Sequence, residues 1–253
     1  MRKIIIIFAL IILLCKITFC DETKYAVIIS ANMEWKAVKK IFPKEKYQNS
    51  IWGEYFYKKI NEHNVLFFHE GWGKVAAAGA TQYVIDKFNP EVLINLGTCG
   101  GIEGETERFD VILVDKTIIY DIKEAMGDSK EAISSYTTNI DLSWLGDQYP
   151  QDVKKNLLVS GDRDLVPKEI SKLKSEYGAV AGDWETGAIA YVAKKNNVKL
   201  LILRGVSDVV TTKGGEAYGN FDLFIQRTEK VMTDLIKQLP KWIDYIHSRD
   251  KKS

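Results

Sequence analysis

Apolar runs of strand length alternate along this chain with stretches that show helical periodicity. The runs lack the polar alternation of a strand with one face in water, so each is predicted to be buried on both faces. The predicted strands cover residues 25–30, 91–96, 110–114, 157–160 and 199–203. Apolar strands that alternate with helices indicate a mostly parallel sheet with helices on both faces.

The intervening stretches predict four helices and one hairpin. The helices are one that begins at Glu34 and those covering 75–88, 187–195 and 221–247. The last is expected to be interrupted at Pro240, because proline lacks the N–H that a helix interior needs. Residues 54–59 and 65–69 flank a polar turn and are predicted to pair as a hairpin.

No linker, internal repeat or shift in composition divides the chain after its first twenty residues. The predicted fold is therefore a single-domain α/β fold over residues 21–253, with a mixed, mostly parallel central sheet flanked by helices. Of the 253 residues, 46% are hydrophobic and 27% are charged. This is enough apolar material for one large core.

The first twenty residues have the pattern of a secretory signal peptide. Arg2 and Lys3 precede the uninterrupted apolar run 4–14, which is shorter than the ~20 residues of a membrane-spanning helix. The alternative, a buried N-terminal helix of the domain, is disfavoured because the run has no polar face. We expect residues 1–20 to direct export, with cleavage after Cys20 or lipid attached to Cys20. The protein would then be periplasmic, secreted or lipid-anchored.

The charge balance narrows the classes of partner. The chain holds 35 Lys and Arg against 34 Asp and Glu, a formal net charge of +1. Three of the basic residues lie in the first twenty, so the remainder carries 32 basic and 34 acidic residues. Such a chain, with no basic stripe, has no electrostatic basis for binding nucleic acid. A small-molecule substrate is the better expectation.

Cysteine and histidine usage limits disulfide and metal chemistry. Cys15 and Cys20 lie in the N-terminal segment, which leaves Cys99 without an intramolecular disulfide partner in the domain. The three histidines are scattered without the spacing of metal ligands, so we expect no metal and no cofactor. Because no histidine lies near Cys99 in the sequence, we expect a packed thiol rather than a nucleophile.

Polar residues follow several predicted strands directly. In sheets of this kind ligands bind beyond the carboxyl ends of the strands, so these positions are the candidate functional residues. They are 31–34, 97–101, 161–164 and 204–208, together with 182–185 at the start of a helix. Carboxylates from several strand ends would then meet in one cleft, as general acid–base catalysis requires.

Each of these segments also has a purely structural interpretation. The glycine run 97–101 is not a phosphate loop of the Lys-Ser/Thr type, and alone it indicates a tight turn or a close backbone approach. Asp183 and Glu185 stand where acidic residues cap a helix, and the Ser-Asp pair at 207–208 is suited to cap a turn. Glu34 is compatible with an exposed acid in a first helical turn. Only their combination carries a functional argument.

Four segments in this order resemble the nucleoside phosphorylase superfamily, most nearly its 5′-methylthioadenosine/S-adenosylhomocysteine nucleosidases. They are VIISANMEWKAV (27–38), GWGKVAAAGATQYVIDKFNPEVLINLGTCGGI (71–102), LLVSGDRDLV (157–166) and GDWETGAIAYVAKKNNVKLLILRGVSDVV (182–210). The resemblance extends over nearly all of residues 25–240. A glutamate that opens an alanine- and glycine-rich helix, then a strand, then Arg-x-x-Ser-Asp is a specific combination.

The resemblance implies an enzyme that cleaves an N-ribosidic bond through a transition state with oxocarbenium character. It implies that Asp208 protonates the purine at N7, which requires a raised pKa, and that Ser207 orients Asp208. It also implies that Glu185 accepts hydrogen bonds from the ribose hydroxyls and that Glu34 activates the attacking water. The further residues that it implies in substrate binding are Trp184, Thr98, Gly100, Asp183 and Arg204.

The segment after the first strand bears on the choice between hydrolysis and phosphorolysis. Phosphorylases of the superfamily bind phosphate there with a Gly-Asp-Pro-x-Arg type loop, whereas this chain has Ser-Ala-Asn-Met-Glu at 30–34. A carboxylate without an arginine repels an anion and polarises a water, so hydrolysis is expected. The alternatives are a phosphate-dependent purine nucleoside phosphorylase and a non-catalytic exported adhesin or storage protein on the same fold.

Two positions depart from the family pattern. Asp164 stands where a base-stacking aromatic is expected, and Trp184 stands where the nucleosidases have a methionine. The resemblance therefore predicts adenosine-type nucleosides and leaves open whether methylthioadenosine, adenosylhomocysteine or a related compound is the substrate. Because the family assembles as dimers or trimers of dimers, we expect a homodimer or higher homo-oligomer. Trp72 and the aromatic segment 52–57 are candidates for the interface, with the core as the alternative.

Overall fold

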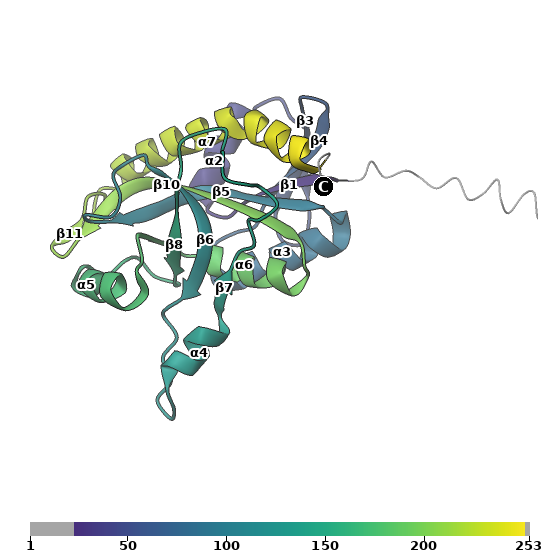
Figure 1. The fold of residues 1–253 in the computed structure, drawn as a ribbon. Coiled ribbons are helices and arrows are strands. Elements are labelled where there is room, and N and C mark those ends of the chain that lie inside the picture. Colours follow the sequence, from purple (N-terminus) through teal and green to yellow (C-terminus); the bar gives the residue numbers. More distant parts are fainter. Residues whose placement is uncertain (1–22, 251–253) are drawn as a thin grey trace, which may run out of the picture.

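One sheet of 11 strands forms the centre of the computed structural model, which describes residues 23–250 (Figure 1). The predictions for residues 1–20 lie outside the described residues. The strands are β1 (Tyr25–Ile29), β2 (Gln48–Asn49), β3 (Glu54–Ile60), β4 (His63–His69), β5 (Val92–Ile102), β6 (Val111–Ile119), β7 (Thr137–Asn139), β8 (Lys154–Ser160), β9 (Ala181–Asp183), β10 (Lys199–Thr211) and β11 (Gly214–Gly215). The α-helices are α2 (Asn32–Ile41), α3 (Gly73–Phe88), α4 (Ser129–Ser135), α5 (Ile170–Lys172), α6 (Thr186–Lys195) and α7 (Phe221–Asp250).

The sheet contains both parallel and antiparallel pairings. β1 pairs in parallel with β4 and β5, and β5 pairs in parallel with β10. β3 and β4 form the predicted antiparallel hairpin. β5 also pairs with β9, and β10 also pairs with β6, so the pairings β5–β10–β6–β8–β9–β5 close into a ring. The expected single-domain α/β fold with a mixed, mostly parallel sheet is confirmed.

Helices cover both faces of the sheet, as the apolar strands predicted. α2 and α7 lie on one face and α3 and α6 on the other (Figure 1). Successive side chains of a strand point to opposite faces. In β1, Val27 and Ile29 therefore join the core under α2 and α7, whereas Ala26 and Ile28 join the core under α3 and α6.

Two segments that were expected to follow strands lie inside them. β5 continues through residues 97–101 and β10 continues through residues 204–208. The two strands pair along this length, with Gly97 opposite Arg204 and Gly101 opposite Val209. The prediction that these strands end at residues 96 and 203 was wrong. The apolar runs mark only the parts of the strands that helices cover, whereas the later parts stay extended because the two strands pair with each other.

α7 runs from Phe221 to Asp250 without the break expected at Pro240, so that prediction was wrong. Proline removes one backbone hydrogen bond from a helix and crowds the preceding turn. Leu239 and Trp242, on either side of the proline, are fully buried in the core under the helix. This burial outweighs the cost of the proline.

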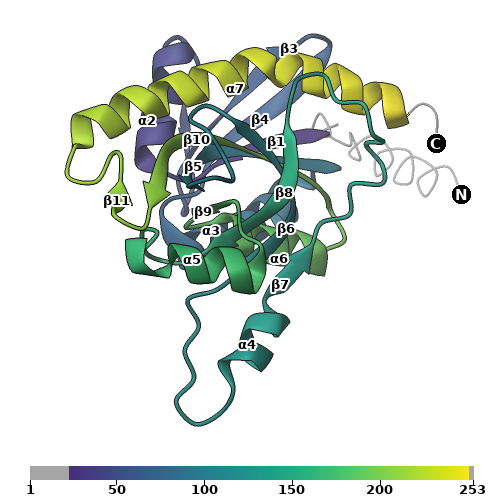
Figure 2. The same ribbon diagram turned by 60° about the vertical axis from the view of Figure 1, so that its left-hand side comes forward.

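Three of the connections lead directly from a strand into a helix. α2 follows β1, α3 follows β4 and α6 follows β9, so each of these helices begins at the carboxyl end of a strand. α4 and the chain before it project away from the sheet (Figure 2). None of the helices within residues 23–250 is long and apolar enough to cross a membrane.

Candidate active site

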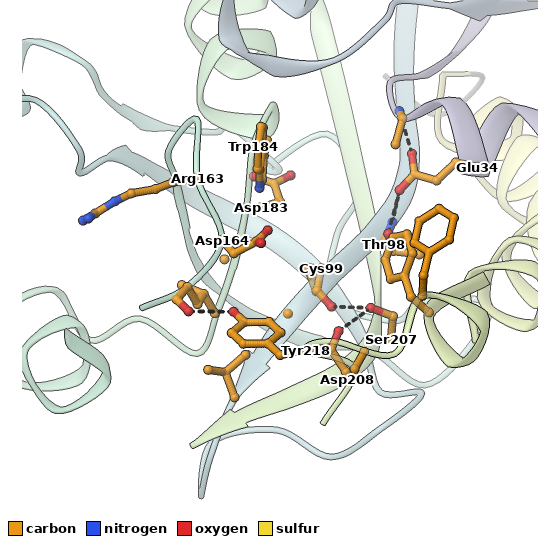
Figure 3. Close-up of a pocket in the computed structure, with 18 of the residues that line it drawn as sticks. Glu34, Thr98, Cys99, Arg163, Asp164, Asp183, Trp184, Ser207, Asp208 and Tyr218 are labelled. Carbon is orange, nitrogen blue, oxygen red and sulfur yellow. Dashed lines mark hydrogen bonds between the residues drawn. The ribbon is translucent and has the colours of Figure 1, made fainter. Parts of the chain in front are cut away.

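A cavity of about 780 Å³ opens where these strands end and helices begin (Figure 3). This volume is in the range of small-molecule sites. Its lining includes most of the predicted site residues, namely Glu34, Thr98, Gly100, Asp183, Trp184, Glu185, Ser207 and Asp208. Side chains from segments far apart in the sequence therefore meet at one place.

Asp208 enters the cavity from an irregularity in β10. The pairing of β10 with β5 shifts between Val206 and Asp208, which makes a β-bulge at Ser207. A bulge bends the strand and redirects its side chains. The Ser207 hydroxyl donates a hydrogen bond to Asp208 Oδ1 (2.8 Å). Burial raises the pKa of Asp208 above its usual value, and the Ser207 hydrogen bond opposes this rise.

Glu34 lies in the first turn of α2 and is 1% exposed, which excludes the exposed helical acid considered from the sequence. Its Oε1 accepts hydrogen bonds from the Thr98 N–H (2.5 Å) and hydroxyl (2.8 Å), and Oε2 accepts from the Ala31 N–H (3.2 Å). The Arg204 guanidinium lies 3.6 Å from Oε1. Burial raises the pKa of Glu34, while the Arg204 charge and the Thr98 donors lower it.

Arg204 was expected among the substrate-binding residues. It is fully buried and is not one of the residues that line the cavity. Its Nη2 lies 3.1 Å from Asp183 Oδ2 and donates to Asn95 Oδ1 (2.9 Å). A Cβ on Gly97 would lie 1.9 Å from Nη1, so the glycine leaves the space that the guanidinium fills. The geometry makes Arg204 the counter-charge of Asp183 and Glu34.

Asp183 and Glu185 have different surroundings although they are two residues apart. Asp183 caps α6, as its position in the sequence suggested, because it accepts hydrogen bonds from the Thr186 N–H and hydroxyl at the start of that helix. It also accepts from the Ser160 hydroxyl (2.7 Å). Glu185 Oε1 accepts from the Gly73 N–H (3.1 Å) at the start of α3. Burial and then the charge of Asp183 raise the pKa of Glu185.

Of the aromatic lining of the cavity, sequence reasoning predicted Trp184 as a substrate-binding residue and missed the rest. The aromatic residues that line it are Trp72, Trp184, Tyr218, Phe221 and Phe224. The rings of Trp72 and Trp184 stack with 6.1 Å between centroids. Tyr218 donates its hydroxyl to the Leu165 carbonyl oxygen (2.6 Å). The available signal was Tyr218, which lies between the glycine pair 214–215 and the helix that begins at Phe221.

Asp164 and Cys99 line the same cavity. Figure 3 shows Asp164 directed into it, whereas Arg163 points away, toward the ring of Tyr120 and the carboxylate of Glu169. Cys99 is buried, and burial raises the pKa of its thiol well above the usual value, which fits a packed thiol. Within residues 23–250, no cluster of three or more potential ligands is arranged to hold a metal ion.

Four buried carboxyl groups therefore line one cavity, and the three other than the helix-capping Asp183 have different partners. Glu34 has a guanidinium beside it, Asp208 has a hydroxyl, and Glu185 has a neighbouring carboxylate. Different surroundings allow one carboxyl to hold its proton while another accepts one. The arrangement suits proton transfer at two points of a single small substrate.

Known proteins share this chain's sequence pattern. A family model described as "Phosphorylase superfamily" matches residues 24–240. The chain belongs to the phosphorylase superfamily. The resemblance seen in the four sequence segments is thereby confirmed.

Relatives within this superfamily include named nucleosidases. A 5′-methylthioadenosine/S-adenosylhomocysteine nucleosidase of Buchnera aphidicola is 31% identical over 198 residues, which cover 73% of this chain and 84% of the relative. A protein of the same name from Oceanobacillus iheyensis is 27% identical over 228 residues, which cover 85% of this chain and 98% of the relative.

Solved structures share the fold at lower sequence identity. The S. pneumoniae nucleosidase of this name, solved with a transition-state inhibitor, has a TM-score of 0.69 at 23% identity and covers 87% of this chain and 99% of its own. Futalosine hydrolase of Helicobacter pylori has a TM-score of 0.70 at 18% identity and covers 89% of this chain and 98% of its own. These similarities show a common fold.

Proposed function

We propose that this protein is a purine nucleosidase that hydrolyses the N-ribosidic bond of adenosine-type nucleosides to free base and a ribose derivative. The substrate class includes 5′-methylthioadenosine, S-adenosylhomocysteine and related compounds. The observation that carries the proposal is the place of Glu34, a buried carboxyl that faces the cavity where the phosphorylases of the superfamily would bind an anion. The named nucleosidases among the relatives support the same reaction.

Asp208 is the acid in this proposal. As the bond between C1′ and N9 breaks, negative charge develops on the purine, and a proton delivered to N7 neutralises it. Burial raises the pKa of Asp208, so it keeps its proton at a higher pH than an exposed aspartate does. The hydrogen bond from Ser207 fixes the orientation of the carboxyl group.

Glu34 is the base that activates water. It receives a proton from the water as the new bond from oxygen to C1′ forms, while Asp208 gives a proton to the leaving purine, so the two transfers balance. Three donors from Thr98 and Ala31 hold the carboxylate in place. The positive charge of Arg204 favours its ionised form, which is the form that accepts a proton.

Glu185 stabilises the sugar in this proposal. Positive charge develops on the ribose ring in the transition state, and a carboxylate beside the ring lowers its energy. Glu185 also accepts hydrogen bonds from the ribose hydroxyls, and the Gly73 N–H holds it for this role. Trp184 packs on the sugar next to it, and Thr98 and Gly100 line the same wall.

Tyr218 provides the aromatic surface for the base, since Asp164 stands where the family pattern led us to expect one. The hydrogen bond to the Leu165 carbonyl holds its ring in the cavity wall. Tyr218 and the proposed acid Asp208 line the same cavity, and burial and then the charges of Asp164 and Asp208 raise the pKa of Tyr218. A purine protonated by Asp208 would lie within reach of this ring.

The chain is a homodimer or higher homo-oligomer in this proposal. Ile51 and Val75 are 85% and 82% exposed, and the Trp52 ring packs on Gly79, one helical turn after Val75. Together with Trp72 at the cavity mouth they form an apolar surface of the kind that marks protein interfaces. Measurement of the mass in solution tests this, and a monomer at high concentration would contradict it.

Export through residues 1–20 is also part of the proposal. Its support is the basic start and the apolar run 4–14 of the sequence. Mass spectrometry of the protein recovered from its native cell would show a chain that begins at Asp21 after cleavage, or a lipid on Cys20. A recovered chain that still begins at Met1 would contradict this part of the proposal.

The reaction is tested by measuring base release from adenosine, inosine, methylthioadenosine and adenosylhomocysteine, with and without phosphate. Hydrolysis predicts the same rate in both conditions and a free sugar product. Release that requires phosphate and yields ribose 1-phosphate would establish the phosphorylase alternative. Purified protein that releases no base from any of these nucleosides would favour the non-catalytic alternative.

A further inference from the structure

Glu70 is a fully buried carboxyl group that the mechanism above leaves unused. It follows β4 directly and lies outside the group of residues that line the cavity. Its Oε1 accepts a hydrogen bond from the hydroxyl of Thr81 on α3 (2.7 Å), and its Oε2 accepts one from the hydroxyl of Ser30 after β1 (3.2 Å). A single side chain thus joins two segments that lead to the site.

The first of these segments, residues 30–31 after β1, positions Glu34 through a hydrogen bond. Ser30 is followed by Ala31, whose N–H donates to Glu34 Oε2 (3.2 Å). The backbone N–H of Glu70 also donates to the Ile29 carbonyl oxygen (2.8 Å). Glu70 therefore holds the end of β1 through both its backbone and its side chain, next to the peptide that positions Glu34.

The second segment, residues 71–73 leading into α3, positions Glu185 through a hydrogen bond. Glu70 is followed by Gly71, Trp72 and Gly73, and the Gly73 N–H donates to Glu185 Oε1 (3.1 Å). Gly71 and Gly73 have φ values of +88° and +80°, which L side chains rarely adopt, so this short path has a defined shape. Any shift at Glu70 is passed through three residues to the donor that holds Glu185.

We propose that Glu70 is a positioning residue that acts as a neutral carboxylic acid to hold the Ala31 and Gly73 N–H groups in place for Glu34 and Glu185. The inference rests on the proposed nucleosidase function, which supplies the roles of those two carboxylates. As a neutral acid, Glu70 would donate to one of these two hydroxyls and accept from the other, because a hydroxyl can both donate and accept.

The surroundings of Glu70 favour this neutral form. Burial raises the pKa of Glu70 to about 8. The hydroxyls of Thr81 from α3 and Ser30 after β1 lower this pKa, as does the charge of Arg204 from β10, but the effect of burial is larger. Loss of the proton would place a third buried carboxylate near Arg204, in competition with Glu34 and Asp183.

The test compares Glu70→Gln and Glu70→Ala with the wild type in kcat and KM, measured from about pH 6 to about pH 9.5. Glutamine copies the shape of the neutral acid and does not ionise. We expect Glu70→Gln to stay near the wild-type kcat at neutral pH and to move the alkaline fall in activity to higher pH. We expect Glu70→Ala to lose about tenfold or more in kcat with a smaller change in KM, because misplaced catalytic groups act mainly on the transition state.

Glu62→Gln is the matched control, since Glu62 lies on the exposed turn of the β3–β4 hairpin, whose last residue directly precedes Glu70. It is expected to leave kcat and the pH profile unchanged. If Glu70→Ala does not fold, the pH profile of Glu70→Gln decides alone. A Glu70→Gln profile identical to that of the wild type would overturn the inference while leaving the proposed function intact. A wild type without base release would contradict the proposed function and the inference together.

Discussion

Arg204 sets the charge balance of the site from behind its wall. The guanidinium is fully buried and lies near both Asp183 and Glu34. A buried charge without a partner is costly, so the arginine and the two carboxylates depend on one another. Gly97 is part of this arrangement, because any side chain there would overlap the guanidinium. Glu34, the proposed proton acceptor, thus has a positive counter-charge although it is buried.

The ring of Tyr218 is expected to contribute to substrate affinity by stacking on the base. Tyr218→Ala removes the ring and is expected to raise KM by about tenfold, since stacking of a base on an aromatic ring contributes about 1–3 kcal/mol. Tyr218→Phe keeps the ring and loses only the hydrogen bond to the Leu165 carbonyl, so its KM should stay close to that of the wild type. Steady-state kinetics with one nucleoside compares the three proteins. Equal KM values for Tyr218→Ala and the wild type would remove Tyr218 from the base site.

At this scale the sequence identified most residue types of the site but not how each is held. The Arg-x-x-Ser-Asp pattern singled out Asp208, yet the bulge at Ser207 depends on how two distant strands align. Glu34 was equally compatible with an exposed position, because its burial comes from contact with Thr98 on β5. Tyr218 was missed because a tyrosine near a helix start has no pattern that distinguishes a cavity wall from an exposed surface.

Two long strands carry the site at the scale of elements. β5 and β10 each begin in the apolar centre of the sheet and end as walls of the cavity. Their first halves were predictable because they are continuous apolar runs. Their second halves contain glycines and polar residues, so the pattern indicated loops, and only their mutual pairing keeps them extended.

Pro240 allows a prediction about α7. Pro240→Ala restores a backbone N–H in the interior of the helix and removes the clash with the preceding turn, so the free energy of unfolding should rise by about 1–3 kcal/mol. Urea denaturation measures the change. Lys237→Ala, at an exposed position of the same helix, is the control and should change stability by less than about 0.5 kcal/mol. A destabilised Pro240→Ala would show that α7 needs the proline.

At the scale of the whole molecule, two helical layers bury the sheet and with it several carboxyl groups. Glu34, Glu70, Glu185 and Asp208 come from four different segments and are all at least nine-tenths buried. The helices that make the core therefore also create the surroundings that raise the pKa of each group. The fold and the acid–base chemistry of the site have the same physical origin.

Stability is expected to fall as the pH rises from about 5 to about 8. Burial raises the pKa of Glu70 to about 8, against 4.5 for an ordinary glutamate, and raises those of Glu34, Glu185 and Asp208. The folded state then binds protons that the unfolded chain releases, so stability present at low pH is lost as pH rises through the folded pKa. Urea denaturation at a series of pH values should show this slope, and Glu70→Gln should make it shallower. A slope that is the same in Glu70→Gln and in the wild type would contradict the burial of Glu70 as a neutral acid.

The central claim is that Asp208 protonates the leaving purine. The direct measurement is the rate of Asp208→Asn on methylthioadenosine and on para-nitrophenyl riboside, whose leaving group departs without a proton. The account predicts a loss of about 10²–10⁴-fold on the nucleoside and a much smaller loss on the nitrophenyl riboside. An Asp208→Asn variant that releases purine at the wild-type rate, or that loses both activities equally, would contradict it.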